Sequence, residues 1–173
     1  MANNQSRFEQ IPITLRDGRK VIVRPISRKD ADRLVEFHES LSDRTVYQRF
    51  FAAHPHLTEK EVERFTHVDH QLREAYVATI DDQIIAVGRL DTIDDKSAEV
   101  AFVIRDDYQK QGLGSALFSL LAETARVQGI RTFVAEVLPQ NRAMIRLFEV
   151  FGESIKKETE DGVTHIEVSL GKK

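Results

Sequence analysis

The 173-residue chain contains no cysteine, and only 4 of its residues are proline and 8 are glycine. Without cysteine it can form neither disulfides nor thiolate zinc sites, and it cannot carry an acyl group on an enzyme thiol. Low proline and glycine, with 41% hydrophobic and 31% charged residues, exclude a fibrous or disordered chain. A chain of this length buries one core, so we expect a single domain over residues 11–173, preceded by a loose polar tail at residues 1–10.

Long apolar segments and a strong excess of one charge are also missing. No run approaches the ~20 apolar residues of a membrane span, and the N-terminal MANNQSRFEQ lacks the apolar core of a signal peptide. We therefore expect a cytoplasmic protein without a membrane partner. The formal charge of -3 provides no general attraction to nucleic acid, so nucleic acid is not an expected partner. Any site for an anion has to be local.

Strand and helix patterns alternate along the chain. Alternating apolar runs at residues 11–15 and 21–25 flank Asp17 and Gly18, which predicts a hairpin. Ser27 and Thr58 are candidate N-caps of helices that we expect to end near residues 42 and 65. Apolar residues at intervals of three and four predict an amphipathic helix from residue 113 to Gly129. We also predict a helix at residues 141–151, and strands at residues 74–80, 83–90, 98–105, 132–138, 153–157 and 164–170.

The order of these elements predicts the fold class. Hairpin connections make the early strands antiparallel, whereas the later strand, helix, strand passage requires one parallel crossover. The expected fold is α/β (α+β), a mixed, mostly antiparallel central sheet of about seven strands with helices on both faces.

The most informative segment is AEVAFVIRDDYQKQGLGSALFSLLAETA, in which a strand passes through a glycine-containing turn into the amphipathic helix. Unpaired N–H groups and the helix dipole at such a helix start attract a pyrophosphate. Gly112 and Gly114 allow close approach, and Lys110 adds a mobile charge. An ordinary glycine turn is the alternative. No GK[ST] follows, which excludes a Walker loop, and the third glycine of the dinucleotide fingerprint is missing.

Gln109, Gly112 and Gly114 match the Q/R-x-x-G-x-G/A signature of the GNAT superfamily of acyl-CoA N-acyltransferases. LPQNRAMIRLFEVFGES resembles a second block of that family, and VRPI, LSDRTVYQRFF and RFTHVDHQLREAYVA resemble the bacterial protein lysine acetyltransferases that act on acetyl-CoA synthetase. This resemblance, over residues 21–170, implies a GNAT-like fold and acetyl-CoA as co-substrate, without a metal. It implies N-acetylation of an amine, with a protein lysine as the expected acceptor. A small amine (polyamine, amino acid or antibiotic) or a non-catalytic acyl-CoA-binding module is the alternative.

The resemblance also assigns cofactor-binding positions. Backbone groups of Phe102, Val103 and Ile104 would hold the pantetheine arm of acetyl-CoA, and Asn141 would contact that arm, cap the following helix, or do both. A homodimer, if one forms, would by analogy use the final strands at residues 153–170. The turn that would cradle the pyrophosphate comprises Gln109, Lys110, Gln111, Gly112, Leu113, Gly114 and Ser115.

Acyl transfer requires that the amine first lose a proton. An alkylammonium has a pKa of about 10.4, so forming the free amine at pH 7 costs roughly 4.6 kcal/mol. Glu99, on the strand before the phosphate turn, resembles the catalytic glutamate of the protein acetyltransferases and is the candidate base. An outward-facing strand residue is the alternative interpretation. Phe148 stands where many relatives have a Tyr that protonates the leaving thiolate, so we expect Phe148 to line the pantetheine tunnel instead. Tyr108 is a weak substitute for that proton donor.

Other polar residues are expected to be structural. Asp106 and Asp107 are predicted to be solvated turn residues. The histidines lack the spacing of a metal site, although His70 is a candidate for the border of the acceptor pocket. Acidic residues on the first two predicted helices would attract a basic acceptor or simply be solvated. The histidines are His54, His56, His67 and His70, and the acidic residues are Glu36, Glu39, Glu61 and Glu63.

Overall fold

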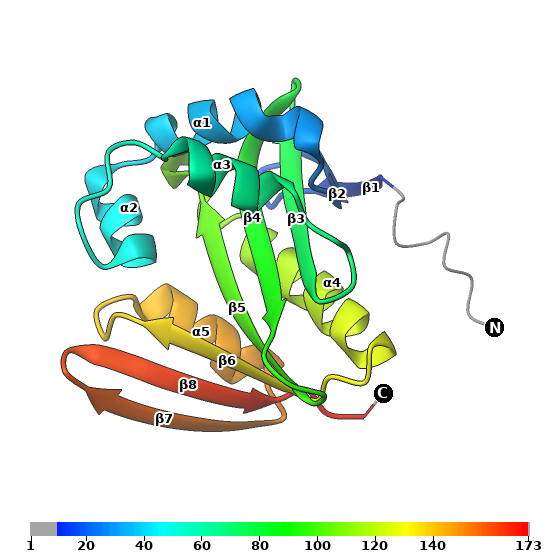
Figure 1. Cartoon of the computed structure of the whole chain (residues 1–173), viewed down its shortest axis with the longest axis vertical. Coiled ribbons are helices and arrows are strands. Elements are labelled where there is room, and N and C mark those ends of the chain that lie inside the picture. The colour runs from blue at the N-terminus through cyan, green and yellow to red at the C-terminus, as the bar shows by residue number, and fades with distance from the viewer. Residues whose placement is uncertain (1–9, 173) are drawn as a thin grey trace.

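The computed structural model describes residues 10–172, which form one mixed sheet with helices on both faces (Figure 1). The sheet has eight strands, against an expected sheet of about seven, in the order β1-β2-β3-β4-β5-β6-β8-β7, and each predicted strand range has a counterpart among them. The predicted loose tail at residues 1–10 falls, apart from Gln10, outside the described residues. The strands are β1 (Ile11–Thr14), β2 (Lys20–Pro25), β3 (Arg73–Ile80), β4 (Gln83–Thr92), β5 (Ser97–Ile104), β6 (Thr132–Val137), β7 (Ser154–Glu160) and β8 (Val163–Ser169).

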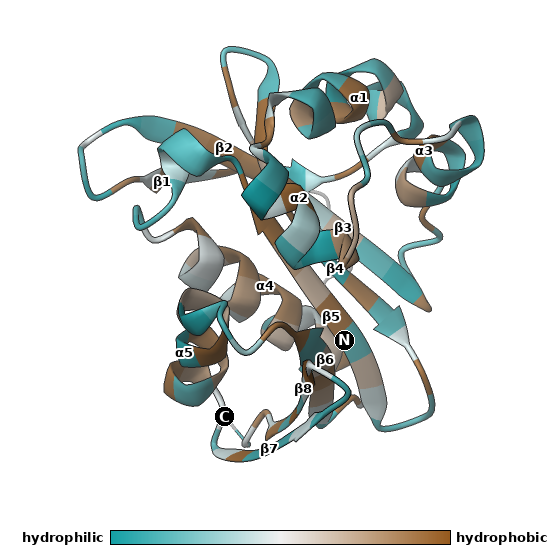
Figure 2. Ribbon diagram, turned by 90° about the vertical axis from the view of Figure 1, so that its left-hand side faces the viewer, coloured by the Kyte–Doolittle hydropathy of each residue, from teal (hydrophilic) through white to brown (hydrophobic). Residues whose placement is uncertain are grey.

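Two helix layers cover the two faces of the sheet, as Figure 2 shows. One layer contains α1 (Ala31–Ser40), α2 (Asp43–Phe50) and α3 (Glu59–Thr66), and the other contains α4 (Leu113–Val127) and α5 (Arg142–Phe151). Strand residues alternate between the layers: Val77 and Val87 pack with Leu34 of α1, whereas Tyr76 and Phe102 pack with α4. Each layer therefore has its own apolar core. None of the helices within residues 10–172 combines the length and apolar character needed to cross a membrane.

The helix α4 approaches β4 closely at Gly88. A methyl group on Gly88 would lie 3.2 Å from the Phe102 side chain and 3.3 Å from those of Leu117 and Leu121. Such distances leave no room for a side chain, so the missing Cβ of Gly88 sets the height of α4 above the sheet.

The helix α2 was not predicted from the sequence. Ser42 caps α2 by accepting a hydrogen bond from the Thr45 N–H at 3.2 Å, and Phe51 ends it with a left-handed backbone (φ 59°). Only Thr45 and Val46 of α2 are buried, so the helix makes a small contact with the apolar core. The predicted helix before it is also shorter than expected: Arg28–Asp30 form a 3-10 turn, and α1 ends at Ser40.

The sheet splits between β5 and β6. These parallel strands pair only through Ser97, Ala98 and Glu99, which lie opposite residues 132–134. Beyond Glu99, β5 stays paired with β4 while β6 continues along β8, and Figure 1 shows the two strands separating. The edge of β5 that faces β6 is consequently open over residues 100–104.

Candidate active site

The open edge of β5 presents backbone groups of alternate residues. The Arg105 N–H donates to the Ile85 carbonyl of the neighbouring strand β4 at 2.9 Å, so the backbone N–H of Arg105 points toward β4. The backbone N–H and C=O groups of successive residues point to opposite edges of a strand. Those of Val103 therefore also point toward β4, whereas those of Phe102 and Ile104 point into the gap between β5 and β6. The Ile104 carbonyl already accepts from the Gln109 side chain at 3.0 Å. Of the three predicted pantetheine positions, Phe102 therefore has the backbone best placed to pair with a bound arm.

The turn after β5 is shaped for an anion. Lys110 and Gly112 adopt positive φ angles of 61° and 94°. Gly112 stands at the N-cap position of α4 without any side-chain cap, and the first helical hydrogen bond runs from the Ala116 N–H to the Gly112 carbonyl at 3.1 Å. The N–H groups of Leu113, Gly114 and Ser115 precede that bond, so they have no intrahelical acceptor. These donors fit a pyrophosphate.

Gly114 has a different role from Gly112. A Cβ on Gly114 would make ordinary contacts with Ile104 and Leu147 at 3.5 and 3.6 Å, and no positive φ is required there. The protein itself thus tolerates a side chain at this position, and the glycine leaves the helix start accessible. The Leu113 side chain is buried in the core, so only its backbone is available to a phosphate.

The opening hairpin holds the phosphate turn, which the sequence did not indicate. The Arg16 N–H donates to the Gln111 carbonyl at 3.2 Å, and the Asp17 N–H donates to the Gln111 side chain at 3.0 Å. The Gln109 amide also donates to Thr45 Oγ1 of α2 at 3.3 Å. Gln109 and Gln111 therefore brace the turn with their side chains, and the Gln109 N–H and the Gln111 carbonyl are also bonded within the protein.

The helix α5 borders the gap from the other side. Asn141 caps it, as expected, by accepting from the Met144 N–H at 3.3 Å. Phe148 is 1% exposed and packs against Phe102 and Phe118, with ring centroids 6.2 and 5.6 Å away. It supports the wall formed by Phe102, and its contact with a pantetheine arm stays a prediction. Tyr108 is buried with Arg19 over its ring at 4.0 Å, so it is poorly placed to act as an acid.

Glu99 lies at the point where β5 and β6 separate, opposite Asp91 of β4 and Val134 of β6. Its side chain points away from the α4 layer and enters a charged pocket of about 220 Å³ beneath α2 and α3. The Glu99 side chain is exposed, and the space to which it is exposed is this pocket. We call it the charged pocket; its lining residues are Arg49, Phe50, Arg64, Phe65, Val68, Arg73, Glu74, Arg89, Asp91 and Glu99.

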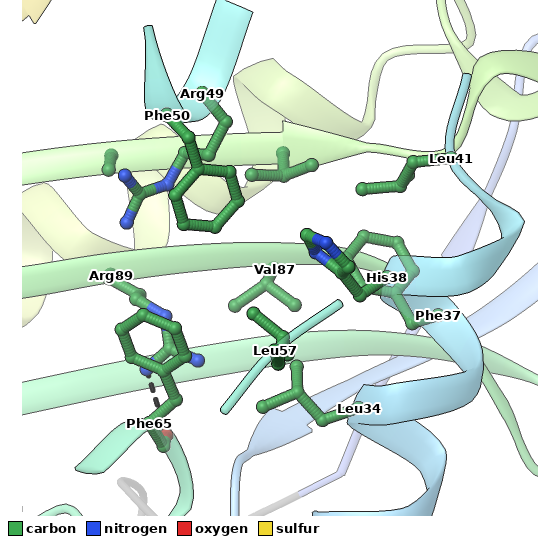
Figure 3. Close-up of a pocket in the computed structure, with 12 residues that line it drawn as sticks. Leu34, Phe37, His38, Leu41, Arg49, Phe50, Leu57, Phe65, Val87 and Arg89 are labelled. Atoms are coloured by element: carbon green, nitrogen blue, oxygen red, sulfur yellow. Dashed lines mark hydrogen bonds between the residues drawn. The ribbon is translucent and has the colours of Figure 1, made fainter. Parts of the chain in front are cut away.

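A second, mostly apolar pocket of about 30 Å³ adjoins the charged pocket (Figure 3). It is lined by side chains of α1 and of the sheet, including Leu34, Phe37 and Val87. Four residues line both pockets: Arg49, Phe50, Phe65 and Arg89. The two pockets thus form one continuous site with an apolar and a charged part.

Positively charged arginine side chains lie close together at the boundary between the two pockets. Arg73 pairs with Asp91 at 2.9 Å, and Arg89 donates to the Phe65 carbonyl at 2.8 Å while lying 4.4 Å over the Phe65 ring. Burial, followed by the charge of Arg49, lowers the pKa of Arg89 to about 9, so Arg89 stays cationic at neutral pH. Burial also lowers the pKa of Arg49, and the negative charge of Glu99 partly offsets this effect.

Asp106 and Asp107, predicted to be solvated turn residues, also make structural contacts. Asp106 accepts hydrogen bonds from Ser42 Oγ at 2.7 Å and Thr45 Oγ1 at 3.0 Å, which anchors α2 to the phosphate turn. Burial opposes ionisation of Asp106, but these hydrogen bonds outweigh it and lower its pKa. Asp107 pairs with Arg105 at 2.7 Å. Both aspartates are exposed and lie in a 3-10 turn, as predicted, but the sequence did not indicate that Asp106 also binds α2.

The predicted histidines and helix acids are mostly engaged with one another. Glu61 caps α3 at the Thr58 N–H (2.8 Å) and lies 3.0 Å from His54, so it is not free to attract an acceptor. His70 lies 2.8 Å from the buried carboxylate of Glu74, and Glu74, rather than His70, lines the charged pocket. No three His, Asp or Glu side chains within residues 10–172 are close enough to hold a metal ion.

Sequence reasoning missed the arginines of the charged pocket. Arg49, Arg64, Arg73 and Arg89 come from α2, α3, β3 and β4, and no spacing in the sequence links them. Only LSDRTVYQRFF and RFTHVDHQLREAYVA, the segments that resembled a known subgroup, pointed to this region.

Comparison with known proteins agrees with this geometry. Residues 35–152 match the model of the acetyltransferase (GNAT) family. The acetyltransferase Pat of Mycolicibacterium smegmatis is 30% identical over 92% of this chain, and the chain spans about half (49%) of that relative's length.

Solved structures give the same result. The GNAT domain of S. lividans PAT is 44% identical and superposes with a TM-score of 0.86, covering 93% of this chain and 97% of that domain. The yncA protein of Salmonella typhimurium, solved with acetyl-CoA, is 17% identical and shares the fold, with a TM-score of 0.70 over 88% of this chain and 95% of its own. The chain therefore belongs to the GNAT family of acetyltransferases.

Proposed function

We propose that this acetyltransferase moves the acetyl group of acetyl-CoA to the side-chain amine of a lysine in a protein. The position of Glu99 carries the proposal. This carboxylate lies where β5 and β6 separate, between the open strand edge on one face and the charged pocket on the other. A thioester that enters along the open edge and an amine that enters through the pocket would meet beside Glu99.

The residues present fit acetyl-CoA. Phe102 offers backbone groups to the pantetheine arm, and the uncapped start of α4 offers N–H donors to the pyrophosphate, with Lys110 nearby. The acceptor ammonium loses its proton to Glu99, directly or through a water. The amine nitrogen then bonds to the thioester carbon, and the Phe102 N–H is placed to stabilise the oxyanion that forms. Collapse of this intermediate breaks the carbon–sulfur bond and releases coenzyme A as a thiolate.

No protein acid is required for that last step. Phe148 carries no proton, and Tyr108 is buried beneath Arg19. Because a thiolate is a good leaving group, with an ordinary pKa of about 8.5, it can leave unprotonated and take a proton from solvent. The similarity to the S. lividans PAT domain and to M. smegmatis Pat supports a protein as the acceptor.

The test is a calorimetric titration with acetyl-CoA, followed by an assay of free thiol release with acetyl-CoA synthetase and with a polyamine panel as separate acceptors. Turnover on the protein supports lysine acetylation, and turnover only on small amines would replace it with a small-molecule acceptor. Binding without any turnover would indicate a non-catalytic acyl-CoA-binding module. Absence of acetyl-CoA binding would refute the assignment of the phosphate turn.

A further inference from the structure

Arg49 is an arginine of the charged pocket whose guanidinium has no hydrogen-bond acceptor among the described residues. It is half-buried on α2 and lines both pockets. Among residues 10–172, its guanidinium has no hydrogen bond and no carboxylate oxygen within 4.0 Å, and its central carbon lies 5.1 Å from the Phe50 centroid. A guanidinium has five N–H donors, and leaving them without acceptors in a half-buried site is unfavourable.

Arg89 adds a second, partly satisfied guanidinium next to Arg49. One of its nitrogens donates to the Phe65 carbonyl, and it makes no ion pair within residues 10–172. Figure 3 shows the guanidinium groups of Arg49 and Arg89 at the same end of the cluster, beside the rings of Phe50 and Phe65. Their mutual repulsion contributes to the lowered pKa of Arg89. A bound anion would relieve this repulsion and supply acceptors to both groups.

The carboxylates of the pocket do not balance these charges. Asp91 is paired with Arg73, and Glu74 accepts from its own neighbour, the Ala75 N–H, at 3.0 Å and lies beside His70. Glu99 is then the one remaining carboxylate of the described lining, and it faces three guanidinium groups. The three are Arg49, Arg64 and Arg89. The free charges thus consist of one negative group at the strand split and an excess of positive groups beside it.

This arrangement matches an acceptor that carries both an ammonium and a carboxylate. We propose that the acceptor protein places an acidic side chain next to the target lysine, and that Arg49 and Arg89 bind its carboxylate while the amine reaches Glu99. The inference rests on the proposed function. Arginine suits this role because its planar group binds a carboxylate through two parallel hydrogen bonds. Arg49 and Arg89 are accordingly specificity-determining residues of the acceptor site.

The first experiment compares two peptides that are identical except for Glu or Gln beside a single lysine. The ratio of their kcat/KM values is measured for the wild type, R49Q, R89Q and R44Q, the last a control on the exposed surface of the same helix α2. We expect the wild type and R44Q to prefer the Glu peptide by about tenfold, the effect of one charge-assisted contact. R49Q and R89Q should show a preference below about twofold. Equal use of both peptides by the wild type would overturn the inference even if a variant failed to fold, and so would a preference that survives in both variants.

A second experiment separates failure of this inference from failure of the proposed function. Free lysine and cadaverine, which is lysine without its carboxylate, are compared as acceptors in the same assay. If no peptide or protein is acetylated, but lysine is preferred to cadaverine in an Arg49-dependent manner, the result supports the carboxylate site and refutes the protein acceptor. If cadaverine is used as well as lysine while no peptide reacts, both proposals are wrong.

Discussion

Substitution of Gly112 by Ala tests the phosphate site most directly, because a second glycine of the same helix provides a matched control. Gly112 begins α4 with φ 94°, and Gly129 follows its end with φ 88°. A Cβ at either position would have no heavy atom within 4 Å, so neither substitution causes a clash. Both variants, G112A and G129A, therefore suffer only the backbone penalty of a non-glycine residue at positive φ, about 1–2 kcal/mol.

The two variants should be equally destabilised but should differ in cofactor binding. A loss of about 1 kcal/mol lowers the Tm of a domain of this size by about 2–4 °C. Only G112A places a methyl group beside the N–H donors of Leu113 and Gly114. Loss of one hydrogen bond to a charged phosphate costs about 1.5–3 kcal/mol, which corresponds to at least a tenfold rise in the Kd for acetyl-CoA.

Thermal unfolding and calorimetric titration of both variants check this prediction. Unchanged acetyl-CoA affinity in G112A, with the expected loss of stability, would show that the start of α4 is not the pyrophosphate site. Equal weakening of binding in G112A and G129A would mean that general destabilisation of α4, and not the local donors, controls affinity.

Three further substitutions test other parts of the structure. E99Q should lower kcat by about 10²–10³-fold with an unchanged Kd for acetyl-CoA, because it removes the base but keeps the shape; a kcat within threefold of the wild type would exclude Glu99 as the base. G88A should cost about 1–3 kcal/mol by overpacking Phe102 and Leu117, measured by urea unfolding, and an unaltered midpoint would show that α4 can move away freely. D106N should be less stable than the wild type at pH 7, by under about 1 kcal/mol because Asp106 is exposed. Since the pKa of Asp106 is lowered from 3.8, its stabilisation is present above that value and is lost as the pH falls below it. The unfolding free energies of D106N and the wild type, measured in urea, should therefore differ at pH 7 and converge near pH 3. A difference that stays the same at both pH values would contradict the role given to the carboxylate.

Local signals in the sequence predicted the elements that depend on neighbouring residues. Thr58 and Asn141 cap helices because a side chain and the N–H three residues later are always close together. The strand, glycine turn and helix around Gly112 were likewise visible, since the residues that build an anion site at a helix start are consecutive. These features needed no information on packing.

The helix α2 shows the limit of that approach. Its turns are held by Ser42 and by Asp106, which lies 64 residues away along the chain, and only Thr45 and Val46 are buried. A helix of only eight residues gains its stability from such tertiary contacts, and contacts between distant residues leave no local signal in the sequence.

The sequence alone determined the family, and it predicted an anion-binding turn and Glu99 as the candidate base, because each rests on a contiguous motif. The tertiary structure decided where β5 and β6 separate, and therefore that Glu99 lies between a strand edge and a pocket. It also brought Arg49 of α2 next to Arg89 of β4. Charges from separate elements become neighbours only through sheet register and helix packing, and for that reason the acceptor side of the site was not readable from the sequence.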